Sequence, residues 1–254
     1  MKKMLITSFK DTLISKDESI SLPTMLSIDK LRKNNNLFVV ATSSLLRTII
    51  DYNESYIFSD YIISYNGAYV YDMIKDKTIY KKNIPSTILN KLTKLKSNDM
   101  AFLTLNDTYY IGKSYNYDFP IEIVDLNDFI SFHKKDVYEV IIHYKKKDLD
   151  EIIKYIKQFN INYFFRKKGK DTYIEIVYKD IDKYNSTKLI CEKEKINVKN
   201  IISIGNGTND YELVKNTIGN CIKNGEKEIK RVAEYVTHNE YSEGVREVIE
   251  KYFD

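Results

Sequence analysis

The sequence predicts an α/β protein in which a doubly wound, mostly parallel sheet is interrupted by an inserted α+β domain. In the first part of the chain, short apolar runs alternate with helical patterns, as expected of parallel strands joined by crossover helices. In the middle, pairs of strands joined by short turns predominate, and afterwards the alternation returns. We therefore predict one domain made of residues 1–81 and 181–254, and a second domain, residues 82–180, inserted into it.

The composition is typical of a soluble globular protein. Of the 254 residues, 43% are hydrophobic and 30% are charged, and the formal net charge is +4. Because the charges are interspersed, they favour no nucleic-acid partner. The two cysteines, Cys191 and Cys221, have the spacing of neither a disulfide framework nor a metal site. No apolar stretch could span a membrane and the start lacks a signal-peptide pattern, so we expect a cytoplasmic protein without a membrane partner.

The N-terminal part contains strands predicted from continuous apolar runs. Apolar residues after Leu22 have helical spacing, and Asn66-Gly67-Ala68 is a turn signal that joins the third strand to a hairpin partner. The predicted elements are a strand at Met4–Phe9, a helix at Leu22–Asn34, and strands at Leu37–Ala41, Tyr61–Ser64 and Tyr69–Tyr71, with a further helix before Tyr61.

The inserted domain has a different pattern, with two helices and paired strands. Its predicted elements are a helix at Ile84–Leu95, strands at Ala101–Leu105, Thr108–Gly112 and Val137–Tyr144, a helix at Leu149–Phe159, and strands at Tyr163–Arg166 and Thr172–Val177. The remaining elements are helices at Ser186–Lys195, Tyr211–Asn216 and Glu226–Tyr235, strands at Ile201–Ile204 and Gly219–Ile222, and a C-terminal helix from Ser242.

Polar residues follow three of the predicted parallel strands. They are Ser8 to Asp11, Thr42 to Ser44, and Gly205 to Asp210, where the strand runs into a Gly-x-Gly turn. Ligands of doubly wound sheets bind outside the carboxyl ends of the strands, so these segments are the candidate site. The alternative is that they are ordinary turns and helix caps.

Several of these segments resemble motifs of the Cof-type branch of the haloacid dehalogenase superfamily, phosphatases with a Rossmann-like core and an inserted cap. The matching segments are Asp11-Thr12-Leu13, which resembles the end of Asp-x-Asp-Gly-Thr-Leu; Val39 to Thr42; Asn66-Gly67-Ala68; Ile181-Asp182-Lys183; Gly205 to Asp210, which resembles Gly-Asp-Gly-x-Asn-Asp; and Ile222 to Gly225. The resemblance runs from Lys3 to the C-terminus and implies the same fold.

The resemblance also implies a mechanism. In that family the first aspartate attacks phosphorus to give an aspartyl-phosphate, a second protonates the leaving oxygen and then activates water, and Mg²⁺ neutralises the phosphoryl charge. The matching positions here are Ser8 for the nucleophile, Lys10 for the acid/base group, and Asn206 and Asp210 for metal ligands.

Of these four positions, only Asp210 keeps an acidic residue. A Mg²⁺ site without its anionic ligands is expected to be weak or absent, and Lys10 can pair with Asp210 in its place. A serine hydroxyl is a poor nucleophile unless a base takes its proton, and no histidine or carboxylate near Ser8 in the sequence is an obvious base.

The phosphate-holding positions of the family are retained. Thr42 supplies a hydroxyl, Lys183 supplies a cation, and the backbone amides after Ser8 can form an anion nest. Asn209 and Asn66 match positions that support the loops.

We therefore predict a phosphatase-like protein that lacks phosphatase chemistry and binds a phosphorylated or anionic small molecule, or acts as a regulatory module for a protein partner. One alternative is an active Mg²⁺-dependent phosphomonoesterase acting on small phosphorylated metabolites, with replacement carboxylates such as Asp171 and Glu175 from the inserted domain. Another is a structural interaction module.

Overall fold

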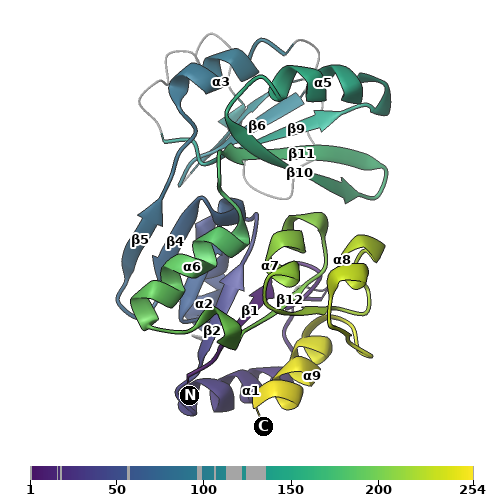
Figure 1. Cartoon of the computed structure of the whole chain (residues 1–254). Coiled ribbons are helices and arrows are strands. Elements are labelled where there is room, and N and C mark those ends of the chain that lie inside the picture. The colour runs from purple at the N-terminus through teal and green to yellow at the C-terminus, as the bar shows by residue number, and fades with distance from the viewer. Residues whose placement is uncertain are drawn as a thin grey trace. The chain divides into compact units, whose positions relative to one another are not determined.

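The computed structural model divides into two compact units (Figure 1). The core unit comprises Met1–Tyr80 and Asp182–Asp254, and the inserted unit comprises Lys81–Ile181. The structure describes residues 2–15, 17, 19–55, 58–95, 99–105, 107–112, 122–123 and 136–253.

The core unit is built on one sheet. Its strands are β1 (Met4–Ser8), β2 (Leu37–Ala41), β3 (Tyr61–Ser64), β4 (Tyr69–Asp72), β5 (Lys77–Lys81), β12 (Ile201–Gly205), β13 (Ile218–Cys221) and β14 (Tyr235–Val236). Within the described residues their order is β14-β13-β12-β1-β2-β3-β4-β5. All pairings from β14 to β3 are parallel, and β3 and β4 form an antiparallel hairpin. β1 therefore lies between β2 and β12, at the centre of the parallel part.

Helices bury both faces of this sheet. They are α1 (Leu22–Lys33), α2 (Leu46–Ser55), α6 (Lys183–Glu194), α7 (Tyr211–Lys215), α8 (Lys227–Val232) and α9 (Tyr241–Phe253), with short 3₁₀ turns η1 (Tyr65–Gly67), η3 (Val198–Asn200) and η4 (Thr208–Asp210). Ile190 of α6 and Leu213 of α7 belong to one buried cluster with Ile6 of the central strand. Because strand side chains alternate between faces, Leu5 and Val40 point to the opposite side, and both are fully buried. Burying each such side chain stabilises the folded state by about 1.5–3 kcal/mol relative to leaving it exposed.

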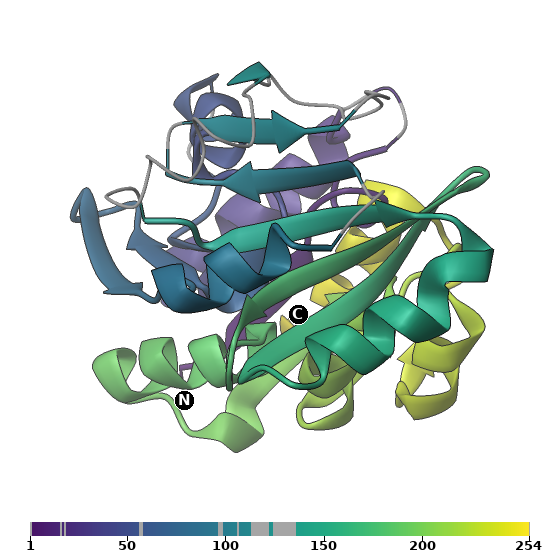
Figure 2. The same cartoon turned by 90° about the horizontal axis from the view of Figure 1, so that it is seen from above.

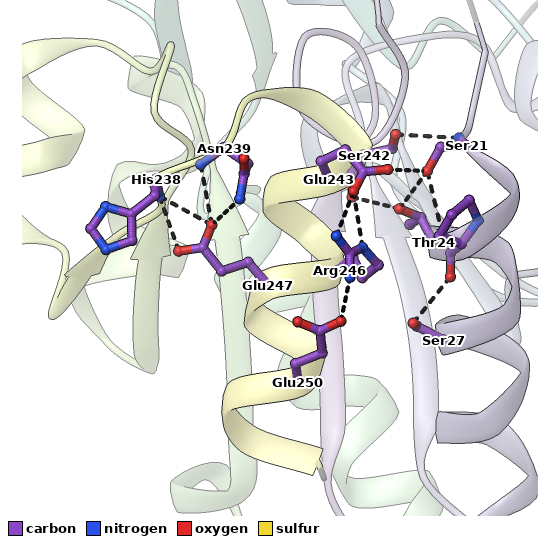
Figure 3. Close-up of polar contacts among 11 residues, drawn as sticks. Ser21, Thr24, Ser27, His238, Asn239, Ser242, Glu243, Arg246, Glu247 and Glu250 are labelled. Carbon is purple, nitrogen blue, oxygen red and sulfur yellow. Dashed lines mark hydrogen bonds and ion pairs between the residues drawn. The ribbon is translucent and has the colours of Figure 1, made fainter.

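Helices α1 and α9 lie side by side and are joined by hydrogen bonds (Figures 1 and 3). The Thr24 hydroxyl donates to the Ser242 carbonyl at 2.8 Å, and the Ser21 hydroxyl donates to Glu243. Arg246 in turn donates to Glu243 at 2.9 Å. The first and last long helices of the core unit thus stabilise each other.

Among its described residues, the inserted unit has one sheet with helices packed against it. Its strands are β6 (Asp99–Leu103), β7 (Thr108–Ile111), β8 (Glu122–Ile123), β9 (Glu139–Tyr144), β10 (Ile161–Lys168) and β11 (Asp171–Tyr178), in the order β10-β11-β9-β6-β7-β8 among the described residues. All pairings are antiparallel except that of β7 with β8. The helices α3 (Ser86–Leu92) and α5 (Leu149–Ile156), the latter preceded by η2 (Lys146–Asp148), pack on one face of this sheet (Figure 2).

The predicted fold class is confirmed: a Rossmann-like parallel core with an α+β insertion. Differences are local. The helix predicted at Glu226–Tyr235 ends at Val232, because Tyr235 instead pairs with Asn220 in β14, and β5 was not predicted. Within the described residues, no helix is long and apolar enough to cross a membrane.

A first prediction concerns the segment before α9, which is tied down by the carboxylate of Glu247. This carboxylate accepts hydrogen bonds from the backbone amides of His238 and Asn239 at 3.0–3.1 Å (Figure 3). It also accepts a hydrogen bond from the Tyr235 hydroxyl. Burial alone would raise the pKa of Glu247, but these hydrogen bonds lower it below its ordinary value.

We expect Glu247→Gln to lower the free energy of unfolding by about 1–3 kcal/mol at pH 7, since hydrogen bonds to a charged group are lost. The stabilisation requires the ionised carboxylate, so it is complete above the ordinary glutamate pKa and is lost as pH falls through the lower folded-state pKa. Urea denaturation of both proteins across this range measures the difference, which should shrink in acid. A difference that grows as the pH falls would contradict this assignment, and Glu250→Gln, on the same helix, is the control.

Candidate functional site

The carboxyl ends of β1, β2 and β12 meet at one edge of the core sheet. Ser8, at the end of β1, lies opposite Ala41 of β2, and Thr42 follows Ala41 directly. On the other side Thr7 lies opposite Ile204, so the loop after β12 begins beside Ser8. The parallel register thus brings together three segments that the sequence indicated.

Ser8, Lys183 and Asp210 form a buried cluster at this edge. The Ser8 hydroxyl donates to Asp210 Oδ1 at 2.5 Å, and Lys183 Nζ donates to the same oxygen at 2.6 Å. Lys183 Nζ also lies 3.3 Å from Ser8 Oγ. The side chains of Lys183 and Asp210 are 3% and 0% exposed, and Ser8 is 3% exposed. Three segments far apart in sequence therefore share one charged, water-excluded contact.

The other oxygen of Asp210 is held by its own loop. Asp210 Oδ2 accepts from the backbone amides of Asn206 at 2.9 Å and Gly207 at 3.3 Å. Gly205 makes room for this side chain, because a Cβ atom at Gly205 would lie 2.6 Å from the Cβ of Asp210. The glycine that ends β12 therefore lets Asp210 turn back over the strand end and directs Oδ1 to Ser8.

Asn209 joins this loop to the loop after β3. Its side-chain amide donates to Asn66 Oδ1 at 2.9 Å, and the backbone amide of Asn66 donates to the Thr42 carbonyl at 3.0 Å. Asn66 has a φ of 52°, in the left-handed region that asparagine tolerates well. The Thr42 hydroxyl accepts from the Ser44 amide at 3.0 Å, so its own hydrogen is directed elsewhere.

Lys183 is positioned by the first turn of α6. Asp182 caps this helix by accepting from the Asn185 amide at 2.7 Å, and burial raises the pKa of Asp182. Gly67 packs closely against the same turn: a Cβ atom there would lie 2.4 Å from the Asp182 carbonyl oxygen. Gly67 also has a φ of 110°, and its carbonyl accepts from the Ser186 hydroxyl at 2.6 Å. The Asn-Gly turn thus sets the position of α6, and with it Lys183.

Lys10 does not pair with Asp210, so that expectation was wrong: the partner of Asp210 is Lys183. The physical reason is that α6 already supplies a buried ammonium to Asp210, whereas Lys10 is only partly buried. Among the described residues Lys10 forms no ion pair. The following Asp11 has a φ of 59°, at a position where the family motif has glycine.

The loop after Ser8 is partly closed on itself. The amides of Leu13 and Ile14 donate to the Phe9 carbonyl at 2.9 Å and 3.0 Å, so they are not directed at the strand ends. The predicted anion nest is therefore limited, at most, to amides nearer Ser8.

Carboxylates outside the motifs differ in their surroundings. Glu226 was not singled out from the sequence. Its backbone amide donates to the Asn206 carbonyl at 2.8 Å. The pKa of its carboxyl is raised by burial and by the nearby charges of Glu228 and Asp210. Asp171 and Glu175 are engaged within the inserted unit, where Asp171 lies 3.3 Å from His143 and Glu175 lies 2.7 Å from Arg166. No sequence signal distinguished Glu226 from any other surface glutamate.

The residues at the family's metal positions do not suit Mg²⁺ in this arrangement. Mg²⁺ takes oxygen ligands in near-octahedral geometry and is usually bound through carboxylates. Both oxygens of Asp210 are occupied by Ser8, Lys183 and loop amides, and Asn206 is neutral. Within the described residues, no three His, Cys, Asp or Glu side chains are grouped so as to hold a metal ion.

The fold and the strand-end residues define a class of protein, and comparison with known sequences agrees with it. Residues 6–249 match the haloacid dehalogenase-like hydrolase family, so the chain belongs to this family, as predicted. The 5-amino-6-(5-phospho-D-ribitylamino)uracil phosphatase YitU of Bacillus subtilis (strain 168) is 22% identical, covering 95% of this chain and 94% of that protein.

Solved structures show the same fold. The subclass IIB sugar phosphatase BT4131 superposes with a TM-score of 0.84 at 18% identity, covering 98% of each chain. The phosphatase-superfamily protein BT1666 of Bacteroides thetaiotaomicron has a TM-score of 0.82 at 17% identity, covering 99% of this chain and 95% of that one.

A second prediction tests how Gly67 positions α6. We expect Gly67→Ala to lower the free energy of unfolding by about 2–4 kcal/mol, because the new Cβ would combine a left-handed φ with a backbone clash. The control is Gly169→Ala: Gly169 also has a positive φ, of 60°, but no atom lies within 4 Å of the added Cβ. Chemical denaturation compares the two. An equal loss in both variants would show that the contact with Asp182 is unimportant.

Proposed function

We propose that this protein binds the phosphate group of a phosphorylated small molecule at the carboxyl ends of β1, β2 and β12, and does not carry out aspartyl-phosphate hydrolysis. The observation that carries this proposal is the Ser8–Lys183–Asp210 cluster. A hydroxyl lies where the family has its nucleophilic carboxylate, and Asp210 beside it is held by the ammonium of Lys183.

The charges at this edge favour an anion. Lys183 and Asp210 neutralise each other, and Lys10 adds a positive charge without an ion-pair partner among the described residues. A lysine ammonium has three donors, and Lys183 uses two of them on Asp210 and Ser8. The third donor of Lys183, the Thr42 hydroxyl and Lys10 together supply charge-assisted hydrogen bonds for a phosphate group.

The same charges disfavour the metal. A divalent cation would meet Lys10 instead of a carboxylate, and would have to displace Lys183 from Asp210. We therefore propose that phosphate binding needs no Mg²⁺, although phosphatases of this family use it. The bound molecule would be a small phosphorylated metabolite of the cytoplasm.

An active Mg²⁺-dependent phosphomonoesterase is the second candidate, favoured by relatives that are named phosphatases. It requires a nucleophile and an acid/base group other than those of the family pattern. A regulatory module for a protein partner, or a purely structural one, is distinguished from both by a failure to bind any phosphate compound.

A third prediction tests the binding site. Inorganic phosphate should bind in calorimetry with an affinity that EDTA does not change. Lys10→Met should weaken binding roughly tenfold, equivalent to about 1.4 kcal/mol, through loss of one charge-assisted contact. Lys199→Met is the matched control, because this exposed lysine precedes β12 at the opposite end of the sheet. Equal weakening in both variants would indicate general charge attraction in place of a site.

A fourth prediction concerns metal binding. Replacing Ser8, Lys10 and Asn206 together by aspartate should create Mg²⁺ binding that the original protein lacks, since three changes restore the acidic ligand pattern. Calorimetry with MgCl₂ measures this, with Lys199→Asp as a control for added negative charge away from the site. No heat of binding in the triple variant would show that the loops do not form the family's metal site.

The turnover test is a phosphatase screen with Mg²⁺ over sugar phosphates and nucleotides. We expect no multiple turnover. Sustained hydrolysis that Lys183→Ala abolishes would refute the proposal and favour the phosphomonoesterase.

A further inference from the structure

Ser8 has a base in the folded chain that the sequence did not indicate. Its hydroxyl donates to Asp210 Oδ1 at 2.5 Å, across a separation of 202 residues. A hydroxyl becomes a competent nucleophile when an adjacent base takes its proton, and the base works best when a third group orients it. At the end of β1, Asp210 is placed to act as such a base, and the amides of its own loop orient its carboxylate.

Backbone amides of its own loop fix the orientation of the Asp210 carboxylate. Its Oδ2 is bonded to the amides of Asn206 and Gly207, which leaves Oδ1 directed at Ser8. Lys183 Nζ lies 2.6 Å from Oδ1 and 3.3 Å from Ser8 Oγ, so an ammonium stands beside both the base and the hydroxyl oxygen. A cation in this place stabilises negative charge that develops on a phosphoryl group attacked by Ser8.

We infer that Ser8 is a nucleophile that accepts a phosphoryl group from a phosphate monoester, with Asp210 as its general base. In this step Ser8 Oγ forms a bond to phosphorus and the bond from phosphorus to the ester oxygen breaks. The Ser8 proton passes to Asp210, which releases it to solvent, and the departing oxygen leaves as an anion that takes a proton from solvent. The products are phosphoserine at position 8 and the free alcohol or phenol, and no further reactant is needed.

The phosphoserine persists once formed. In the family's cycle an acid/base carboxylate two residues after the nucleophile activates water, and here Lys10 occupies that position. The reaction therefore stops after one phosphoryl transfer per chain. This inference rests on the proposed phosphate site, and it adds a covalent outcome to binding.

The experiment uses the full chain with p-nitrophenyl phosphate, without added metal. Intact-protein mass spectrometry should show a single added phosphoryl group, and p-nitrophenolate should be released in a burst of one equivalent without continued turnover. Fragmentation should locate the phosphoryl group on Ser8. Calorimetry with inorganic phosphate is run on every variant, so that a loss of binding is separated from a loss of transfer.

Three variants identify the roles. Ser8→Ala should keep phosphate binding and lose the adduct. Ser203→Ala is the matched control, since Ser203 is a buried hydroxyl on the neighbouring strand β12 that contacts Thr217, and it should form the adduct normally. Asp210→Asn should keep or strengthen phosphate binding, because Lys183 loses its counter-charge, yet slow adduct formation at least a hundredfold. Thermal melting of each variant verifies that it is folded.

Each outcome is decisive. Phosphate binding without any adduct in the original protein refutes the inference and leaves the proposed function intact. An adduct that persists in Ser8→Ala, or that maps to another residue, also refutes it. An unchanged rate in Asp210→Asn removes Asp210 from the role of base. No phosphate binding and no adduct in any protein refutes both proposals.

Discussion

The buried ion pair between Lys183 and Asp210 constrains the geometry of the whole strand-end region. Removing two charges from water costs several kcal/mol per ion, and their attraction offsets this only when the remaining hydrogen-bonding groups are also satisfied. Here the Ser8 hydroxyl and the amides of Asn206 and Gly207 complete the contacts of Asp210. If one member of the pair moved, the other would be left charged and buried, so β1, α6 and the loop after β12 are held together.

The sheet explains why this pair can form at all. Parallel pairing aligns the carboxyl ends of β1, β2 and β12, and the small residues Gly67 and Gly205 allow α6 and the Asp210 side chain to approach. A carboxylate cluster at such an edge needs a metal to offset its repulsion. In this chain Asp210 is the acidic residue kept at the family's metal positions, and Lys183 offsets its charge.

The sequence was informative where the pattern is local and less so where partners are distant. The bounds of β2 and β3 were predicted correctly, because continuous apolar runs end at polar residues. The strand-end pattern also indicated Ser8 and Asp210 as candidate residues, and the folded chain brings these two side chains together. The partner of Asp210 was not predicted correctly, because Lys10 and Lys183 both have long side chains and only the packed position of α6 decides between them. Strands β5 and β14 were missed because edge strands have partly exposed, weakly apolar sequences.

The central position of β1 has a consequence for the order in which the protein can assemble during synthesis. β1 is synthesised before its neighbour β12, which follows almost two hundred residues later. The inserted unit is continuous from Lys81 to Ile181 and holds its own buried cluster, so it can fold while one side of β1 still has no neighbour. Until Ile201–Gly205 leaves the ribosome, the backbone N–H and C=O groups on one edge of β1 lack their native partner, so this is the interval when that edge can pair with other chains.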